Sequence, residues 1–323
     1  MDVAAAALVN LGRSLRAEGY RFVTVTPETH RRVLERDTQR GCGQARTLRD
    51  VFGWNKPFAP SLLPPDMLRS LEAAELCAEE DDLLRAHVRF STIALAGSPP
   101  RLFAHAGFPT TDADAVFFGP DTYRFCALLE RAAGRPRRVV DVGCGSGVGG
   151  LLLGGPGVGG QGIGGQGVAT RIVLSDVNQR ALWFARVNAA LAEIDAEIVQ
   201  SDVLSKVEGE VDLVVSNPPY LRDDAARVYR EGGGAYGEGL AVRIVREALE
   251  RLAPGGRLLL YTGVAVVAGE DQLYGAVRSL LEAARARYDY TELDPDVFGE
   301  ELERPTYASV DRLAAVALHA QLP

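Results

Sequence analysis

Short apolar runs alternate with helical patterns over the C-terminal two-thirds of the chain, and this rhythm restricts the fold more than any other feature. Four runs have the length of a buried strand and end at or beside a polar residue: 138–141, 171–176, 199–203 and 211–216. Strands that alternate with helices form parallel sheets, in which the carboxyl ends of the strands share one edge. We therefore predict an α/β domain with its site at that edge.

A glycine-rich turn follows the first of these runs. The run ends at Asp141, and Gly143 and Gly145 open the segment Gly143-Cys144-Gly145-Ser146-Gly147. Glycines let the backbone turn sharply beneath a strand end and come close to a ligand. Because Gly150 completes a G-x-G-like series, a dinucleotide site is also compatible with the glycines alone.

Acidic residues mark the ends of the next two runs. Asp176, after the second run, is placed to accept hydrogen bonds from two ribose hydroxyls, or to cap the helix that follows. Asp202, at the third run, is placed to meet the exocyclic amine of an adenine, with Val203 against the ring. Together they predict a site for an adenosine-containing ligand.

The fourth run leads directly into Asn217-Pro218-Pro219-Tyr220, the most specific signal in the chain. Two prolines cannot donate to a sheet, so the strand must end there. The Asn217 amide oxygen and the Pro218 carbonyl can accept both hydrogens of an amine or amide and so orient its nitrogen lone pair. Tyr220 offers a face on which a planar group or a cation can stack. We assign Asn217, Pro218 and Tyr220 as catalytic residues.

Taken together, these motifs resemble those of class I S-adenosylmethionine (SAM) dependent N-methyltransferases, above all release-factor glutamine methyltransferases and small-domain RNA methyltransferases. The resemblance covers about residues 116–320. It implies a Rossmann-like, seven-stranded domain over 111–323, SAM as the cofactor, and methyl transfer to an amide, amine or nucleobase nitrogen. The segment 117–122 resembles the part of the family that lies near the cofactor, which adds Phe118. The predicted cofactor-binding residues are Phe118, Asp141, Gly143, Gly145, Asp176, Asp202, Val203 and Asn217.

The N-terminal part predicts a smaller α+β domain over residues 1–110. Helical patterns at 1–20, 29–37, 48–52 and 66–76 surround a brief strand at 22–25, and one or two strands follow at 83–95. Helix, loop, helix and hairpin is the outline of a winged-helix-like module. The acidic run 79–82 at the hairpin makes a poor phosphate contact, which favours docking or packing over DNA binding.

Composition argues against several classes of function and structure. The net charge is −8 over 323 residues, which argues against sequence-independent binding to a phosphate backbone. The four cysteines and four histidines are dispersed, so neither a disulfide framework nor a metal site is expected. We see no membrane span or signal peptide, and we expect a cytoplasmic protein. The Gly-rich stretch 154–167 is interpreted as a flexible surface insertion.

The methyl acceptor is left open among protein, RNA and small molecules, and a homodimer is neither required nor excluded. The segment 229–236 places tyrosines and glycines where a lid can cover the site. One alternative keeps SAM but closes its own amino group into azetidine-2-carboxylate, releasing methylthioadenosine. A second alternative is a DNA-binding regulator that senses SAM. A dehydrogenase is disfavoured because the Asn-Pro-Pro-Tyr loop has no role in hydride transfer.

Overall fold

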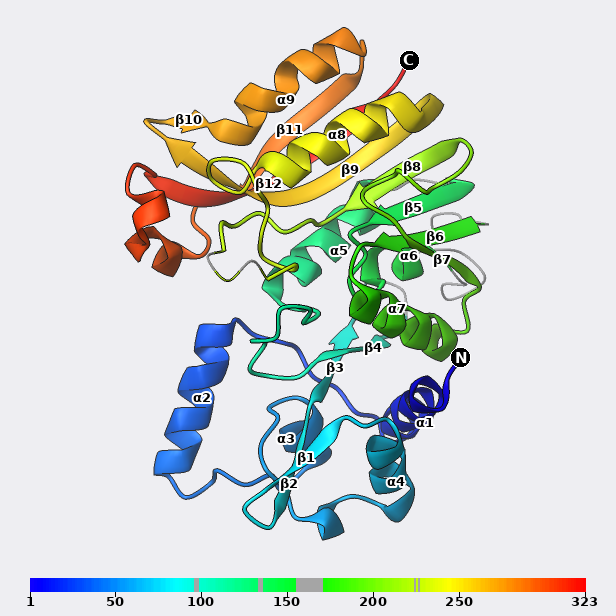
Figure 1. Cartoon of the computed structure of the whole chain (residues 1–323), viewed down its shortest axis with the longest axis vertical. Coiled ribbons are helices and arrows are strands. Elements are labelled where there is room, and N and C mark those ends of the chain that lie inside the picture. Colours follow the sequence, from blue (N-terminus) through cyan, green and yellow to red (C-terminus); the bar gives the residue numbers. More distant parts are fainter. Residues whose placement is uncertain (96–98, 133–135, 155–170, 224, 226) are drawn as a thin grey trace.

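The computed structural model describes residues 1–95, 99–132, 136–154, 171–223, 225 and 227–323. The chain has two halves, with an N-terminal module at one end and a large sheet at the other (Figure 1). The predicted boundary at residue 110 falls between the last strand of the module and the first helix of the sheet domain. Most of the predicted 154–167 insertion lies outside the described residues.

The N-terminal module is built from helices followed by two hairpins. Strand β1 pairs with β2 and strand β3 pairs with β4, both antiparallel. The bounds are α1 (Val3–Ala17), α2 (Pro27–Gln39), α3 (Leu48–Phe52), a 3₁₀ turn η1 (Pro60–Leu62), α4 (Pro65–Ala73), β1 (Cys77–Glu80), β2 (Leu83–Ala86), β3 (Val88–Ile93) and β4 (Arg101–Ala106). Helices α3 and α4 follow in the predicted order, but the hairpin predicted over 83–95 does not form, because its two strands, β2 and β3, pair with β1 and β4 instead. The winged-helix-like description stays a prediction.

Three details of the module differ from the sequence expectations. Residues 22–25 are extended but form no strand; the Phe22 carbonyl accepts one backbone hydrogen bond, from the Thr92 N–H at 2.8 Å. The helix expected over 66–76 ends at Ala73. Strand β1 escaped prediction because its Glu79 and Glu80 are exposed and lack a strand pattern, so pairing with β2 decides its conformation.

The C-terminal half confirms the predicted Rossmann-like domain. Its main strand order is β11-β12-β9-β8-β5-β6-β7, with β10 paired to β9, and β12 runs antiparallel to both of its neighbours. The bounds are α5 (Pro120–Ala132), β5 (Arg138–Val142), α6 (Val148–Leu153), β6 (Arg171–Asp176), α7 (Gln179–Ala192), β7 (Ala196–Gln200), β8 (Val211–Ser216), α8 (Gly239–Arg251), β9 (Leu252–Val267), β10 (Glu270–Asp271), α9 (Gln272–Ala283), β11 (Arg287–Asp294), 3₁₀ turns η3 (Gly299–Glu303) and η4 (Pro305–Tyr307), and β12 (Arg312–Gln321).

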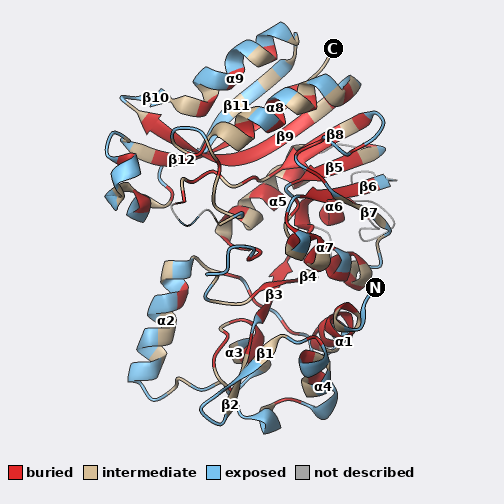
Figure 2. Cartoon of the chain, viewed as in Figure 1, coloured by how far each residue is buried: buried red, intermediate tan, exposed pale blue. Residues whose placement is uncertain are grey.

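Helix α7 joins the two halves because two of its faces are buried. Leu182 and Ala185 pack into the core shared with α5 and α6, whereas Phe184, Val187 and Leu191 pack into the core of the N-terminal module. The other face of the sheet is covered by α8 and α9. Figure 2 shows the buried residues continuing from the sheet through α7 toward the module. The module is therefore fixed against the catalytic half, since burial of such side chains contributes roughly 1.5–3 kcal/mol each.

Candidate active site

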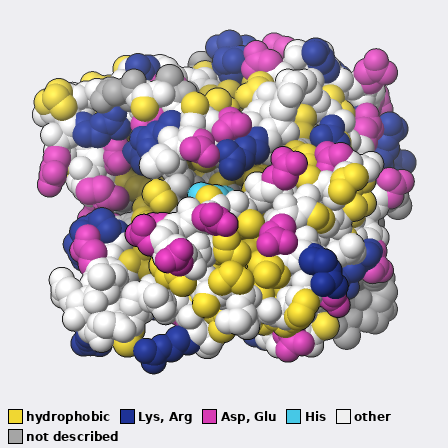
Figure 3. Space-filling view, turned by 60° about the horizontal axis from the view of Figure 1, so that its bottom comes forward, with side chains coloured by type: hydrophobic (Ala, Val, Ile, Leu, Met, Phe, Trp, Pro, Cys, Tyr) yellow, Lys and Arg dark blue, Asp and Glu magenta, His cyan; other side chains and the backbone are white. Residues whose placement is uncertain are grey.

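A cavity of about 800 Å³ lies at the carboxyl edge of the parallel strands. Its wall includes the turn after β5, the ends of β6 and β8, and residues of the N-terminal module around Phe108. Figure 3 shows one face of the molecule with a hollow that exposes apolar side chains and is surrounded by charged ones. Ligands of open α/β sheets bind at this edge, so the cavity is the candidate active site.

The glycine turn after β5 is shaped by positive φ angles at Gly143 (64°) and Gly145 (54°). Both residues line the cavity, and a Cβ added at Gly143 would meet no atom within 4 Å. Asp141 is buried, and its carboxylate accepts a hydrogen bond from the Gly150 N–H at 2.8 Å. Burial raises the pKa of Asp141 to about 7. The turn therefore presents backbone and open space to a ligand.

Asp176, at the end of β6, is buried beside this turn. Its Oδ2 accepts from the Gly145 N–H at 2.9 Å, and its Oδ1 accepts from the Asn178 N–H at 2.9 Å. Burial raises the pKa of Asp176. The N-cap of α7 is Asn178, whose side chain accepts from the Arg180 N–H, so the helix-cap interpretation of Asp176 is wrong. Asp176 instead lines the cavity and fixes the glycine turn.

Asp202 and Val203 also line the cavity, just after β7. The Asp202 carboxylate is 2.9 Å from the Arg243 guanidinium of α8, and its side chain is 61% exposed. Val203 is buried and has a positive φ of 49°. The structure thus brings the two residues to the same wall as Asp176, as the sequence predicts, and adds an arginine beside Asp202.

The Asn-Pro-Pro-Tyr segment leaves the end of β8 and enters the cavity wall. Ser216 anchors it, because the Ser216 hydroxyl donates to the Val142 carbonyl of β5 at 2.7 Å. Within the described part of the chain, neither the Asn217 side chain nor the Pro218 carbonyl has a hydrogen-bond partner, although both residues line the cavity. An amide and a carbonyl left without protein partners at a cavity wall are available to a ligand.

Tyr220 is held differently from the open stacking platform that the sequence predicts. Its ring packs on Gly263 of β9, where a Cβ would lie only 2.1 Å from it, and edge-on to Phe298. Its hydroxyl donates to Asp121 at 2.7 Å, and the Tyr261 hydroxyl donates to the other oxygen of Asp121 at 2.7 Å. Burial is the main cause that raises the pKa of Tyr220. Tyr220 lines the cavity, but neighbouring residues hold both its ring and its hydroxyl in place.

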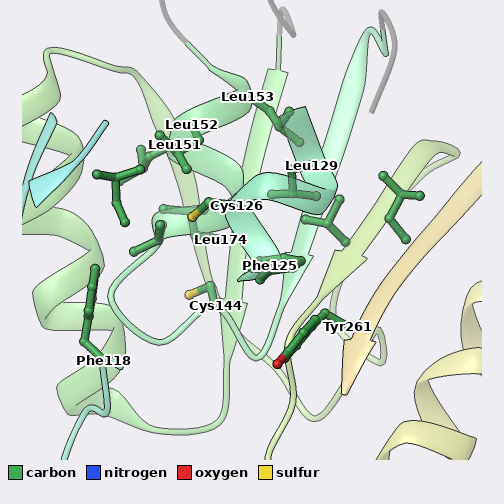
Figure 4. Packing of buried hydrophobic residues seen from close by; sticks show 14 of the residues in the cluster. Phe118, Phe125, Cys126, Leu129, Cys144, Leu151, Leu152, Leu153, Leu174 and Tyr261 are labelled. Carbon is green, nitrogen blue, oxygen red and sulfur yellow. The ribbon is translucent and has the colours of Figure 1, made fainter. Parts of the chain in front are cut away.

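Phe118 is placed outside the cavity wall, contrary to its prediction as a cofactor contact. Its side chain is fully buried, stacks on His105 with 4.6 Å between ring centroids, and lies in the core shown in Figure 4. Its neighbour Phe117 lines the cavity instead, as does Asp121. In an irregular segment, the side that each side chain takes depends on tertiary packing. Asp121 was not among the predicted site residues, although the segment 117–122 that contains it resembles a segment near the cofactor in the family.

The predicted lid segment does contribute to the wall, with residues 227–234. Tyr229 is its anchor: the hydroxyl donates to the Thr110 carbonyl at 2.6 Å, and the ring stacks on Phe117 with 5.9 Å between centroids. Next to it, the Val228 N–H donates to the Ala113 carbonyl at 3.0 Å. The segment therefore spans from the catalytic loop to the linker of the N-terminal module.

Fold and site together define an α/β enzyme domain that binds a nucleotide-like ligand. A family model described as methyltransferase small domain matches residues 125–285. This part of the chain matches that family, which confirms the predicted resemblance to SAM-dependent methyltransferases. No helix of the described residues is long and apolar enough to span a membrane, and these residues contain no cluster suited to a metal ion.

Curated relatives agree with this family. The chain is 32% identical over 205 residues to the ribosomal RNA small subunit methyltransferase C of Chromohalobacter salexigens, covering 60% of this chain and 55% of that protein. It is 33% identical over 166 residues to the release factor glutamine methyltransferase of Deinococcus radiodurans, covering 47% and 55%. The chain thus spans about half the length of these relatives. They support the methyltransferase prediction, and they give no support to a cyclase or a DNA-binding regulator.

The residues present fit SAM as the cofactor. The open turn at Gly143 gives its backbone access to a ligand, the buried carboxylate of Asp176 suits a ribose, and Asp202 lies further along the same wall. The cavity volume of about 800 Å³ lies within the range of about 300–1,000 Å³ typical of pockets that hold drug-sized ligands. The predicted cofactor-binding and catalytic roles of individual residues remain predictions.

Proposed function

We propose that this chain is a SAM-dependent N-methyltransferase that acts on an amide, amine or nucleobase nitrogen. The observation that supports this most is the pairing of two acceptors that have no partner among the described residues, the Asn217 side chain and the Pro218 carbonyl, at the wall of a cavity that fits SAM. We also propose a cytoplasmic location for the enzyme.

The reaction follows from the acceptors on the loop. Bound SAM supplies a methyl group on a positively charged sulfur. The Asn217 amide oxygen and the Pro218 carbonyl accept the two N–H hydrogens of the acceptor, which directs its lone pair at the methyl carbon. The acceptor nitrogen would take the methyl group in exchange for the carbon–sulfur bond of SAM, and the extra proton on nitrogen would leave to water. Positioning thus supplies the acceleration, and no strong base is required.

The loop is rigid enough for this task because its flanks are fixed. Ser216 is hydrogen-bonded to β5, and Tyr220 is hydrogen-bonded to Asp121. A displacement of about 1 Å in a reacting group can cost on the order of 100-fold in rate. Asp141 and Asp176 act at the cofactor side, where their hydrogen bonds to Gly150 and Gly145 hold the turn.

The test is Asn217→Ala, with Asn10→Ala on the exposed face of α1 as the matched control. SAM binding is measured by calorimetry, and methyl transfer from tritiated SAM is measured into whole cell extract. We expect the variant to lose about 100-fold or more in transfer while its SAM affinity stays within a few-fold. Unchanged transfer would contradict the proposal. Loss of SAM binding would make Asn217 a cofactor contact rather than an acceptor contact.

A further inference from the structure

The N-terminal module supplies part of the cavity wall, and the chemistry of that part indicates which ligand the cavity binds beside SAM. The residues from the module and its linker are mostly apolar or aromatic: Pro27, Phe108, Pro109 and Phe117. Phe108 is stacked on the buried His30 with 4.0 Å between ring centroids, so its ring is held in place from behind. A rigid aromatic wall of this kind suits an apolar or aromatic body.

The cavity is bridged by the segment around Tyr229, which is anchored on both sides. Toward the N-terminal linker, Tyr229 donates to Thr110. Toward the C-terminal half, the Arg230 guanidinium pairs with Glu301 at 2.6 Å, and the Arg222 N–H donates to the Tyr307 hydroxyl at 2.7 Å. Because the segment is held at both ends, it stays in the wall of the cavity that Asn217 also lines, and the acceptor has to fit within that cavity.

The charges of the wall also disfavour a phosphate backbone. The three arginines that line the cavity are all neutralised: Arg227 pairs with Asp223, Arg230 with Glu301, and Arg243 with Asp202. The described lining residues also include five aspartates and glutamates and no lysine. Binding of nucleic acid depends on cations that replace the counterions of the phosphates. Among the described residues of the wall, no arginine is left over for that role.

Resting on the methyltransferase function proposed above, we propose that the acceptor is a small free molecule: an amine or amide with an aromatic or apolar body and without phosphate. It enters beside the cofactor in the same cavity of about 800 Å³ and packs against Phe108 and Phe117 while Asn217 holds its nitrogen. The N-terminal module then determines acceptor specificity. The relatives named for ribosomal RNA and release factors are matched over about half of their own length, and the aromatic part of the wall, from Pro27 to Phe117, lies outside the matched family domain, which begins at residue 125.

The test separates possible acceptors by size, small molecules from RNA and protein, before they are incubated with the enzyme. Extract of the cells that make the protein is passed through a 3 kDa filter, and each fraction is incubated with the full chain and methyl-tritiated SAM. We expect at least ten-fold more transferred label in the small-molecule fraction, recovered in organic solvent at alkaline pH. Label that enters RNA or protein of the retained fraction instead would overturn the inference and leave the methyltransferase function intact. Transfer in neither fraction, with SAM bound, would overturn both.

Two variants test whether the aromatic wall is needed for methyl transfer to the small-molecule fraction. Phe108→Ala is expected to lower label transfer to the small-molecule fraction by at least ten-fold at limiting acceptor while SAM affinity changes less than two-fold. Val23→Ala, an exposed apolar residue of the same module, is the matched control and should leave transfer unchanged. Phe117→Leu provides a second, milder change at the wall if Phe108→Ala does not fold. Equal transfer by wild type and both wall variants would refute the assignment of the wall.

Discussion

The two halves of the molecule bury opposite kinds of ionisable group. The catalytic half buries the carboxylates of Asp121, Asp141 and Asp176, and each of them accepts hydrogen bonds from hydroxyl or backbone N–H groups. The N-terminal module buries the basic side chains of His30 and Arg89, and no carboxylate pairs with either among the described residues. Burial is the first cause that lowers the pKa of His30 to about 4 and that of Arg89 to about 10.

The contrast shows what each half is built to do. Acids that accept from fixed donors stay in place, so they can orient a turn and a loop around a ligand. His30 and Arg89, which have no paired carboxylate among the described residues, do not orient a turn or a loop around a ligand. Burial of these two bases is tolerated because aromatic rings and neighbouring polar groups surround them. The site chemistry thus lies with the acids, whereas the module contributes shape. Three predictions test this difference. The first removes Asp121, whose carboxylate accepts hydrogen bonds from two buried tyrosines.

Asp121→Ala should give the largest effect on stability. The change leaves the buried hydroxyls of Tyr220 and Tyr261 without their shared acceptor, and each unsatisfied group costs about 1–3 kcal/mol. We expect a loss of about 4 kcal/mol in the free energy of unfolding, measured by urea denaturation. Asp121→Asn keeps one acceptor and should lose about half as much. Asp195→Ala, at an exposed position, is the control. A wild-type midpoint for Asp121→Ala would show that the two tyrosines do not depend on this carboxylate.

Asp121 also illustrates what the sequence could and could not predict. The four parallel strands β5 to β8 and the glycine turn follow from local patterns, so they were predictable. The partners of Asp121, by contrast, lie 99 and 140 residues away along the chain. The same limit explains Phe118: local sequence cannot tell which of two adjacent phenylalanines faces the cavity and which one packs on His105.

The pH dependence of the N-terminal module is the second test. The pKa of His30 is about 4 in the folded chain and about 6.5 in the unfolded chain, because burial, followed by the charge of Arg89, disfavours the protonated ring. The unfolded chain therefore binds the proton first, and stability is lost as the pH falls from 6.5 toward 4. Between pH 7 and 5 the loss attributable to His30 is about 2 kcal/mol.

His30→Phe should remove that loss. Phenylalanine keeps the stack on Phe108 but gives up the contact of His30 Nε2 with the Trp54 carbonyl at 3.0 Å, so the variant should be somewhat less stable at pH 7. The quantity to compare is the difference in unfolding free energy between pH 7 and pH 5, which should shrink relative to wild type. His87→Phe, at an exposed position, serves as the control. An unchanged difference in His30→Phe would assign the acid sensitivity of the module to another group.

Asp141 should show the opposite sign in the catalytic half. Burial raises its folded pKa to about 7, above the unfolded value of about 3.9, so the folded chain holds the proton more tightly. Its contribution to stability is present below pH 4 and is lost as the pH rises through 7. Asp141→Asn retains an amide oxygen to accept from Gly150 and cannot ionise, so it should remove about 1 kcal/mol of the loss between pH 6 and 7.5. Asp195→Asn is the matched control for urea denaturation at the two pH values. If Asp141→Asn instead steepens the loss, the ionised carboxylate is the form that the glycine turn stabilises, and the opposition between the two halves does not extend to this residue.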